Sequence, residues 1–431
     1  MERLVVEGGR PLEGAVRISG AKNAALPLLA ACLLTDETCV LRNVPDLQDV
    51  RTLRKILAHV GLATFQRGLN AFELTVEEPG RCVAPYGLVS QMRASIYLLG
   101  PLVAKRGYAE VALPGGCVIG HRPVDLHLRG LEALGADLAL ENGTIIARAP
   151  GGLRGAEMDL SGPCGSSVGA TANVVMAACL AEGQTVIHGA AREPDVTELI
   201  RFLQAMGARI EGSGSSTLRI TGVPALGGAE QSVMPDRIEA ATYAMAAALT
   251  GGDVLLEEVD LAHMGAVVEV LARAGVELSE DAPGAVRVRR GERLRAVKVS
   301  TTPYPGFPTD VQAQLLALLT QAKGTSVVRE TIYPDRFMHV AELARMGAEI
   351  RKVGPTAVIQ GPRPLSGAEV KATDLRAGAA LVMAGLAAEG TTVVHDIHHI
   401  DRGYERIEDK LRGLGAAIYR ETPSQTLRRA A

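Results

Sequence analysis

Two patterns of hydrophobic positions alternate along the chain, and they predict two kinds of helix. In the first, Ala, Leu, Val and Met fill nearly every position, as they do in 172–181 and 377–388. A helix that is apolar on all faces is expected to be buried on all sides. In the second, apolar and charged positions alternate with a helical period, which predicts an outer helix with one buried face.

Both kinds of helix lead into strands, and the combination recurs along the chain. An apolar helix leads through a turn into a β-branched strand such as 185–188 or 391–394. An amphipathic helix ends at a glycine before another strand, and this arrangement recurs about every 70 residues, which indicates an internal repeat. The repeated glycines stand at helix ends, where a left-handed residue is needed: Gly61, Gly135, Gly207, Gly275, Gly347 and Gly415.

The repeat predicts an α/β fold of two domains, each built from three units. A chain of 431 residues exceeds one ordinary core, so six units of about 70 residues should group in two halves. In each half the apolar helices are expected inside, surrounded by sheets and amphipathic helices, as an inside-out α/β barrel. The polar stretch 227–232 is the expected joint, so 22–230 forms the first domain. The segment 421–431 is expected to be a loose tail.

Composition and charge exclude several classes of protein. Aromatic residues make up only 3% of the chain and Trp is absent, which favours cores of small aliphatic side chains. The formal net charge of −3 gives no reason to expect nucleic acid or an anionic membrane as partner. The apolar run 24–34 is too short to span a bilayer and lacks a signal-peptide pattern, so we expect a cytoplasmic protein.

Cysteine and histidine do not form a metal pattern. The six cysteines include no Cys-x-x-Cys pair, so we expect reduced thiols and neither a disulfide framework nor a structural zinc. His395, His398 and His399 are close in sequence, but continuing the preceding strand would point them to opposite faces. No metal and no cofactor is therefore expected.

A glycine- and proline-rich loop, 112–127, carries Cys117 beside Arg122. This composition excludes a continuous helix or strand, and Pro123 and Asp125 then suit the start of a helix. A thiol with a pKa of about 8.5 can donate a proton or attack as the thiolate. A packed free cysteine is the structural alternative.

The turns before the six apolar helices also carry polar residues in matching positions. Capping explains Ser and Asp there, but the helix dipole disfavours cations at this end, so an anion bound between the two halves is the alternative explanation. Asp310 is the candidate base and is also expected to cap its helix. The matching positions are Lys22, Arg93, Ser167, Arg237, Asp310 and Arg376.

Lys22, Asn23 and Arg402 are further candidates for binding an anion, and each has a plain structural alternative. Lys22 and Asn23 could be a solvated lysine and a capping amide rather than an anion site. Arg402, in the segment that leads to the last amphipathic helix, could form a surface salt bridge with Asp401 or Glu405.

Taken together, these motifs resemble the UDP-N-acetylglucosamine enolpyruvyl transferases, within the enolpyruvyl transferase family. The resemblance covers nearly the whole chain and implies that residues 1–21 pack with 231–420 as the second domain. It is carried by the segments Gly20–Ala24, Pro114–Cys117, Arg122–Asp125, Phe307–Asp310, Asp335–His339, Thr373–Arg376 and Arg402–Arg406.

The resemblance implies attack of the sugar 3-hydroxyl on C2 of phosphoenolpyruvate, with loss of phosphate from a tetrahedral intermediate, in peptidoglycan synthesis. Cys117 would then be the proton donor and Asp310 the group that takes the hydroxyl proton. The clamp for phosphate and carboxylate would be Lys22, Asn23, Arg122, Arg376 and Arg402. Contacts with the UDP-sugar would come from Arg93, Arg122, Pro123, Val124, Asp125, Leu126, Ser167, Val168, Asp310 and Ile332.

Two other functions are compatible with parts of the pattern. The shikimate-pathway enolpyruvyl transferases share the implied fold and chemistry but lack the Cys117 loop. A catalytically silent scaffold that binds a nucleotide sugar would not need both Cys117 and Asp310.

Overall fold

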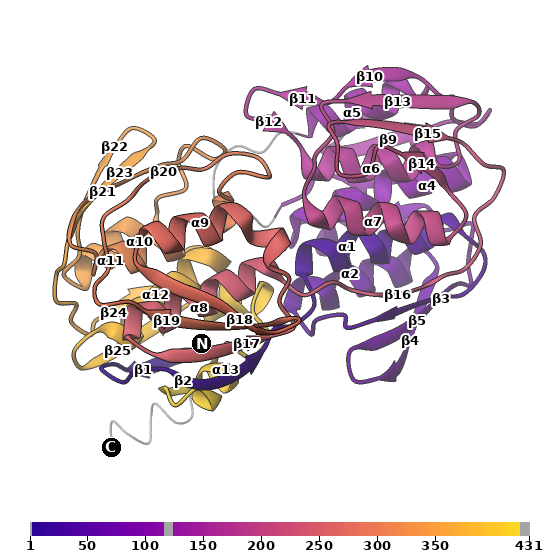
Figure 1. Cartoon of the computed structure of the whole chain (residues 1–431). Helices are drawn as coiled ribbons and strands as arrows, with labels where there is room; N and C mark the ends of the chain where they lie inside the picture. Colours follow the sequence, from indigo (N-terminus) through magenta and orange to yellow (C-terminus); the bar gives the residue numbers. More distant parts are fainter. Residues whose placement is uncertain (1, 116–123, 423–431) are drawn as a thin grey trace. The chain divides into compact units, whose positions relative to one another are not determined.

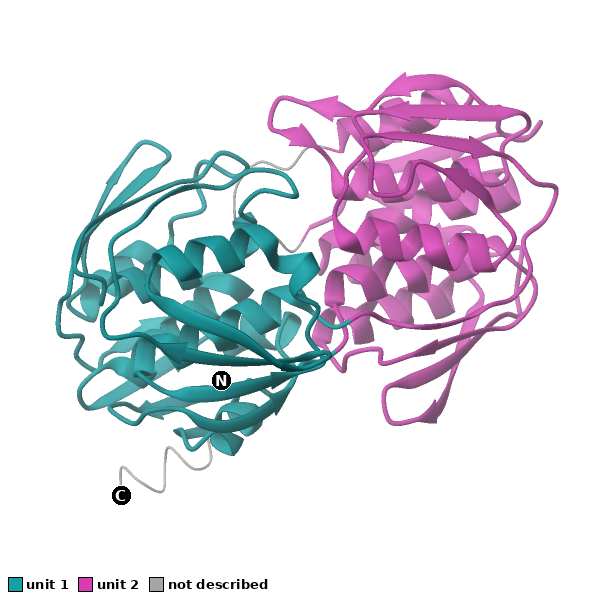
Figure 2. Ribbon diagram, in the orientation of Figure 1, with its two compact units in different colours: residues 1–19, 118–121, 235–431 teal, residues 20–117, 122–234 magenta. Residues whose placement is uncertain are grey.

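A computed structural model describes residues 2–115 and 124–422, which divide into two compact units. Unit 1 contains residues 2–19 and 235–422, and unit 2 contains residues 20–115 and 124–234 (Figure 2). The chain thus enters unit 1, crosses to unit 2 and returns. The predicted joint, 227–232, includes a strand of unit 2. Of the predicted tail, residues 423–431 lie outside the described part, while Glu421 ends a strand of unit 1.

Three mostly buried helices form the core of unit 2 (Figure 1): α1 (Lys22–Ala31), α4 (Leu99–Arg106) and α6 (Val168–Ala178). A short 3-10 helix, η2 (Arg93–Leu98), leads directly into α4. Helices with one buried face lie further out: α2 (Gln48–His59), α5 (Asp125–Ala133) and α7 (Pro194–Ala205). A one-turn helix, α3 (Tyr86–Val89), precedes η2.

Three four-stranded sheets surround this core, and each is a separate sheet. Their strands, in spatial order, are first β16 (Glu230–Ser232), β3 (Cys39–Arg42), β5 (Ala71–Val76) and β4 (Leu62–Gly68). The second sheet has β6 (Val83–Ala84), β7 (Tyr108–Ala112), β9 (Thr144–Arg148) and β8 (Asp137–Glu141). The third has β10 (Glu157–Asp159), β13 (Gln184–His188), β15 (Thr217–Thr221) and β14 (Arg209–Glu211), and β11 (Ser161–Gly162) and β12 (Gly165–Ser166) form a separate hairpin.

Unit 1 repeats this architecture. Its buried helices, which pack against one another, are α8 (Arg237–Thr250), α10 (Gln312–Leu319) and α12 (Leu375–Ala387). Its outer helices are α9 (Gly265–Arg273), α11 (His339–Arg345) and α13 (Ile407–Gly413). The predicted inner and outer helices are therefore confirmed, because the apolar pattern left no face that could remain in water.

The sheets of unit 1 draw on both ends of the described chain. The first has β2 (Glu13–Arg17), β17 (Asp253–Glu257), β19 (Ala285–Arg290) and β18 (Val276–Ala282). The second has β20 (Lys298–Ser300), β21 (Gly324–Arg329), β23 (Thr356–Gly361) and β22 (Glu349–Val353). The third has β24 (Glu369–Lys371), β25 (Thr391–His395), β1 (Arg3–Glu7) and β26 (Ala417–Glu421).

The six four-stranded sheets of the described residues have the same pairing: a parallel edge pair followed by two antiparallel pairs. In five of them the last two strands form a hairpin of consecutive strands. In the sixth, β1 takes the place of one hairpin strand and pairs with both β25 and β26. Residues 3–7 and 13–17 are thereby part of unit 1.

The glycines that mark the repeat adopt the predicted left-handed backbone. All six have φ between +81° at Gly61 and +102° at Gly207. Because a side chain at positive φ meets its own backbone, glycine is the residue that ends these helices at low cost. The sequence repeat therefore has a conformational cause.

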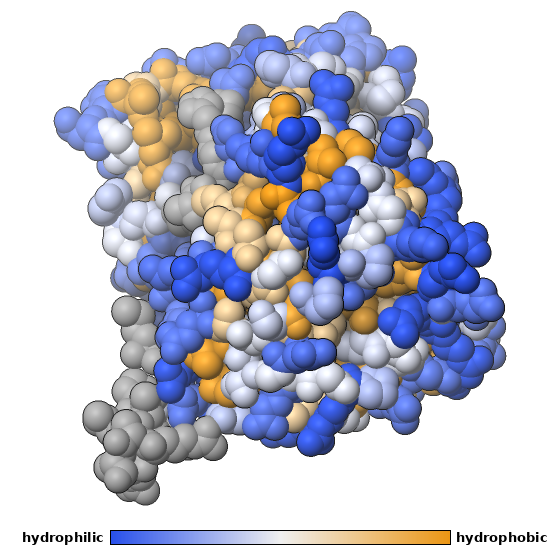
Figure 3. Space-filling view, turned by 90° about the vertical axis from the view of Figure 1, so that its left-hand side faces the viewer, coloured by the Kyte–Doolittle hydropathy of each residue, from blue (hydrophilic) through white to orange (hydrophobic). Residues whose placement is uncertain are grey.

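On the face drawn in Figure 3, hydrophobic residues form separate patches among hydrophilic ones. Over residues 2–115 and 124–422, no helix is both long and apolar enough to cross a bilayer.

Candidate active site

The starts of the buried helices of unit 1 carry the polar residues that the repeat predicted. Asp236 caps α8 by accepting from the backbone N–H of Ile238, at 2.8 Å, and Asp374 caps α12 by accepting from that of Arg376, at 2.8 Å. Arg237 is the first residue of α8, and Arg376 is the second of α12. The equivalent start of α10 is the 3-10 helix η4 (Thr309–Val311), which contains Asp310.

Asp310 does not cap its helix, so that expectation was wrong. The N-cap residue of η4 is Pro308, and no side chain caps this helix. The Asp310 carboxylate instead accepts from Arg336 Nη1 at 2.8 Å and from Arg376 Nη2 at 3.4 Å. Charge-assisted bonds to two guanidinium groups are stronger than one bond to a neutral backbone N–H. The carboxylate thus stands between two cations with 29% of its side chain exposed, while Arg336 is 3% and Arg376 is 1% exposed.

Arg376 is a buried cation with unused donors. Its guanidinium lies 5.3 Å from the ring centre of Tyr404. Burial by itself would lower the pKa of Arg376, but Tyr404 and Asp310 outweigh burial and leave that pKa above its ordinary value. Nε and Nη1 have no hydrogen-bond partner among the described residues. A buried charge normally has all its donors satisfied, so this arrangement suits an anionic ligand.

Arg336 was not assigned a role from the sequence, although it lies in one of the segments that carry the resemblance. Its Nη1 also donates to Thr309 Oγ1 at 3.1 Å, and its Nη2 lies 3.9 Å from Asp374. Thr309 in turn donates to the fully buried Glu330 at 2.8 Å. Arg336 thereby ties Asp310 to the start of a second buried helix.

Glu330 also shapes the segment that contains Ile332. Its Oε1 accepts from the backbone N–H groups of Ile332, at 2.8 Å, and Tyr333, at 3.0 Å, and from Thr301 at 2.7 Å. Ile332 is half-buried. Both oxygens of the buried Glu330 carboxylate accept hydrogen bonds, and breaking any of them would leave a buried polar group without a partner. Glu330 therefore holds this loop in one conformation.

Tyr404 joins the cluster through polar residues of the apolar helices. Its hydroxyl lies 2.9 Å from Thr242 Oγ1 on α8 and accepts from Gln314 Nε2 on α10 at 3.0 Å. Burial raises the pKa of the Tyr404 hydroxyl. Isolated polar residues within otherwise apolar helices are the signal that could have identified Thr242 and Gln314 from the sequence.

Arg402 ends the 3-10 helix η5 (Ile397–Arg402) and is half-buried. Burial, His398 and then Arg402 together lower the pKa of His399, so Arg402 is close enough to act on that ring. The expected continuation of the strand through the histidines was wrong, because β25 ends at His395 and Asp396 is left-handed. Among the described residues, no group of three or more His, Cys, Asp or Glu side chains could hold a metal.

Lys22 begins α1 in unit 2, as predicted, but it is not solvated. Its Nζ lies 3.2 Å from Asp49 Oδ2, and the two side chains are 10% and 8% exposed. Asn23 follows in the first turn and is half-buried, and the helix has no side-chain cap. A buried lysine needs a nearby carboxylate, so Asp49 explains how this cation is tolerated.

The other predicted residues of unit 2 lie at neighbouring helix starts. Arg93 begins η2, which packs against α1 and α6. Ser167 caps α6 by accepting from the N–H of Ala170 at 3.3 Å, and Val168 is the first residue of that helix. Three more of the residues predicted to contact the UDP-sugar lie at the start of α5: Val124 is its N-cap residue, and Asp125 and Leu126 are its first two residues. Cys117, Arg122 and Pro123 lie outside the described residues.

Comparison with known proteins identifies the family. The model of the family described as EPSP synthase (3-phosphoshikimate 1-carboxyvinyltransferase) matches residues 6–411. The chain belongs to this enolpyruvyl transferase family. The enzyme is 50% identical over 420 residues to a protein of Caldanaerobacter subterraneus subsp. tengcongensis named UDP-N-acetylglucosamine 1-carboxyvinyltransferase 1, covering 97% of this chain and 99% of the relative. It is 53% identical over 423 residues to a Gluconacetobacter diazotrophicus protein named UDP-N-acetylglucosamine 1-carboxyvinyltransferase, with coverages of 97% and 99%.

Solved structures confirm the two-domain inside-out α/β fold. The enolpyruvyl transferase NikO from Streptomyces tendae superposes with a TM-score of 0.89 at 28% identity, covering 98% of this chain and 99% of NikO. An EPSP synthase from Acinetobacter baumannii gives a TM-score of 0.78 at 19% identity, with coverages of 98% and 100%, and shows the shared fold. The enzyme therefore belongs to a family that acts on small molecules.

Proposed function

We propose that this enzyme transfers the enolpyruvyl group of phosphoenolpyruvate to the 3-hydroxyl of UDP-N-acetylglucosamine and releases phosphate, as the first committed step of peptidoglycan synthesis. The cytoplasmic location expected from the sequence is part of the proposal, and no cofactor enters it. The observation that carries it is the Asp310 carboxylate held between Arg336 and Arg376, with two donors of Arg376 unused among the described residues. A base beside cations with open donors suits attack by a hydroxyl on a phosphorylated, carboxylated substrate.

The relatives' names support this acceptor over shikimate 3-phosphate. Relatives at 50–53% identity carry the UDP-N-acetylglucosamine name, whereas the EPSP synthase structures match at 19–20%. Identity near 20% supports the fold and not the substrate.

The proposed reaction is an addition followed by an elimination. The sugar oxygen bonds to C2 of phosphoenolpyruvate while Asp310 takes the hydroxyl proton. The methylene carbon C3 receives a proton from Cys117, which gives a tetrahedral intermediate. Loss of phosphate from C2 and of one proton from C3 then restores the double bond in the enol ether product.

Cations and helix starts supply the proposed binding sites. Lys22, Asn23, Arg122, Arg376 and Arg402 hold the phosphate and carboxylate groups, where fixed positive charge stabilises the negative charge that develops. The UDP-sugar is held by a second set: Arg93, Arg122, Pro123, Val124, Asp125, Leu126, Ser167, Val168, Asp310 and Ile332.

A coupled assay tests the reaction. We expect phosphate release only when phosphoenolpyruvate and UDP-N-acetylglucosamine are both present, because phosphate leaves only after the sugar has added. Omission of either substrate is the control. Release with shikimate 3-phosphate in place of the nucleotide sugar would transfer the assignment to the shikimate-pathway reaction.

Replacing Arg376 by lysine tests the anion site. We expect kcat/KM for phosphoenolpyruvate to fall about 100-fold, because an ammonium group cannot reproduce the fork of a guanidinium. Arg345→Lys is the matched control in the same unit, since its side chain is 61% exposed and its nearest carboxylate, Glu342, is 3.8 Å away. Steady-state kinetics of both variants decide the point, and wild-type values for Arg376→Lys would remove Arg376 from the site.

A further inference from the structure

One guanidinium outside the proposed binding set holds the residue next to Arg402. Arg420, on β26, donates to Asp401 through Nη2 to Oδ1 at 2.6 Å and through Nη1 to Oδ2 at 3.0 Å. This is a two-point, charge-assisted contact, which fixes direction as well as distance. Asp401 and Arg402 are consecutive residues at the end of η5, so the backbone of Arg402 is held from its N-terminal side.

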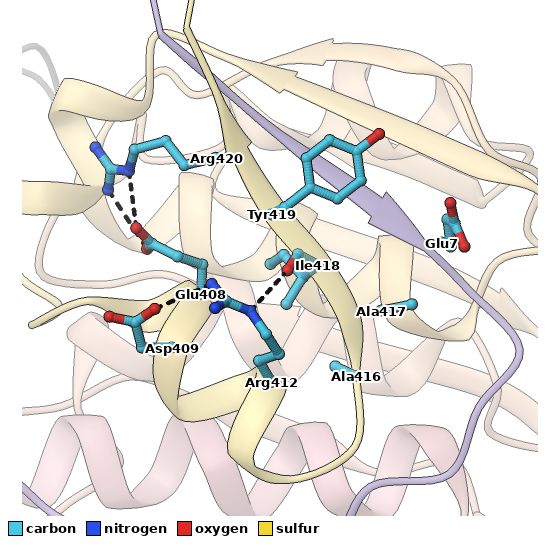
Figure 4. A pocket seen from close by; sticks show the side chains of 9 residues that line it. All are labelled: Glu7, Glu408, Asp409, Arg412, Ala416, Ala417, Ile418, Tyr419 and Arg420. Atoms are coloured by element: carbon cyan, nitrogen blue, oxygen red, sulfur yellow. Dashed lines mark hydrogen bonds and ion pairs between the residues drawn. The ribbon is translucent and has the colours of Figure 1, made fainter. Parts of the chain in front are cut away.

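The same guanidinium holds the far end of this segment. Arg420 Nε donates to Glu408 Oε1 on α13 at 2.8 Å, a contact drawn in Figure 4, and Nη1 donates to Glu2 at 3.0 Å. Glu408 is only 10% exposed and Arg420 is 25% exposed. Arg420 therefore ties β26 to both η5 and α13.

The residues between these two anchors reach the candidate active site and have a constrained backbone. Tyr404 stacks beside Arg376, and Arg406 has φ of +43°, in the left-handed region. A residue other than glycine keeps that conformation only where its surroundings hold it in place. The two anchors provide such a hold at either end of residues 401–408.

We propose that Arg420 is a positioning residue for Arg402, which rests on the role proposed for Arg402 above. Arg420 acts in two ways. It fixes the end of η5, and it occupies the Asp401 carboxylate, which would otherwise be an anion beside Arg402 and compete with substrate for its charge. Removing Arg420 would also leave Glu2, Asp401 and Glu408 close together without their shared cation.

The test compares two arginines that line the same cavity of about 600 Å³ between α13 and β26. Arg412 is the control, because it contacts Asp409 at 3.0 Å and the carbonyl of Ile418 at 3.3 Å rather than Asp401 (Figure 4). We expect Arg420→Met to lower kcat/KM for phosphoenolpyruvate about 10- to 100-fold, as misplacement of a binding group does. The KM for UDP-N-acetylglucosamine should stay at the wild-type value, and Arg412→Met should match the wild type.

Two further variants separate positioning from general stability. Arg420→Lys should recover part of the loss in kcat/KM, because lysine keeps one contact with Asp401. If Arg420→Met does not fold, Arg420→Lys takes its place in the kinetic comparison. In an Arg402→Ala background, Arg420→Met should cause no further loss.

Three outcomes would overturn the proposal: wild-type kinetics for Arg420→Met, an equal loss for both substrates, or losses that multiply with Arg402→Ala. If the wild-type enzyme itself released no phosphate from the two substrates, the proposed function would be wrong. Failure of the proposed function is therefore distinguishable from failure of the role proposed for Arg420.

Discussion

The variant Asp310→Asn is expected to lose about 10²- to 10⁴-fold in kcat, the range by which a positioned acid or base accelerates a reaction. Asparagine has nearly the same shape and keeps one oxygen that can accept from Arg336, while its amide NH2 replaces the oxygen that faces Arg376 at the longer distance of 3.4 Å. It cannot take the hydroxyl proton. The KM values for both substrates should therefore change far less than kcat, which steady-state kinetics with each substrate varied in turn will show.

Asp335→Asn is the matched control for this prediction. Asp335 stands next to Arg336 in sequence, but its side chain is 84% exposed and its nearest cation, Lys352, is 3.9 Å away. This variant removes the same charge without removing the proposed base. Equal turnover of the Asp310 and Asp335 variants would contradict the role of Asp310.

Folding must be measured alongside the kinetics of Asp310→Asn. Removing one partner of a buried ion pair costs about 3–5 kcal/mol. The cost here should be lower, because Asp310 is partly exposed and asparagine retains one of its two acceptor oxygens. A thermal melt of each variant allows the kinetics to be measured well below the midpoint of unfolding.

The variant Cys117→Ala is expected to abolish nearly all turnover, because alanine has no proton to deliver to the methylene carbon of phosphoenolpyruvate. UDP-N-acetylglucosamine binding, measured by calorimetry, should persist. From the family resemblance we also expect fosfomycin to alkylate Cys117, which mass spectrometry of the intact enzyme will detect.

Cys164→Ala is the control for thiol chemistry, since Cys164 is an exposed free cysteine of unit 2. It should keep full activity and still form one fosfomycin adduct, whereas Cys117→Ala should form none. Undiminished turnover of Cys117→Ala would exclude Cys117 as the acid. An adduct that persists in Cys117→Ala would place the reactive thiol elsewhere.

Features that depend on neighbouring residues could be predicted from the sequence. The six glycines at positive φ, the two kinds of helix and the placement of Lys22, Arg237 and Arg376 at helix starts all follow from local periodicity and backbone sterics. These features are encoded within about one helix or turn.

Contacts between residues that are far apart in the chain could not be predicted in this way. Asp310 was expected to cap its own helix, but Arg336 and Arg376, 26 and 66 residues away, hold its carboxylate instead. Lys22 could have been a solvated lysine, yet Asp49 pairs with it in a buried position. Which of the two occurs depends on the charged side chains that folding brings next to the residue, and the local pattern of the sequence does not identify them.

The sequence by itself determined the repeat, the inner and outer helices and the end of the buried helices at which polar residues gather. Only the tertiary structure decided which side chains meet: Arg336 with Asp310, Tyr404 with Arg376, and Arg420 with Asp401. The physical reason is that backbone conformation is set by adjacent residues, whereas ion pairs form between groups that folding brings together and removes from water.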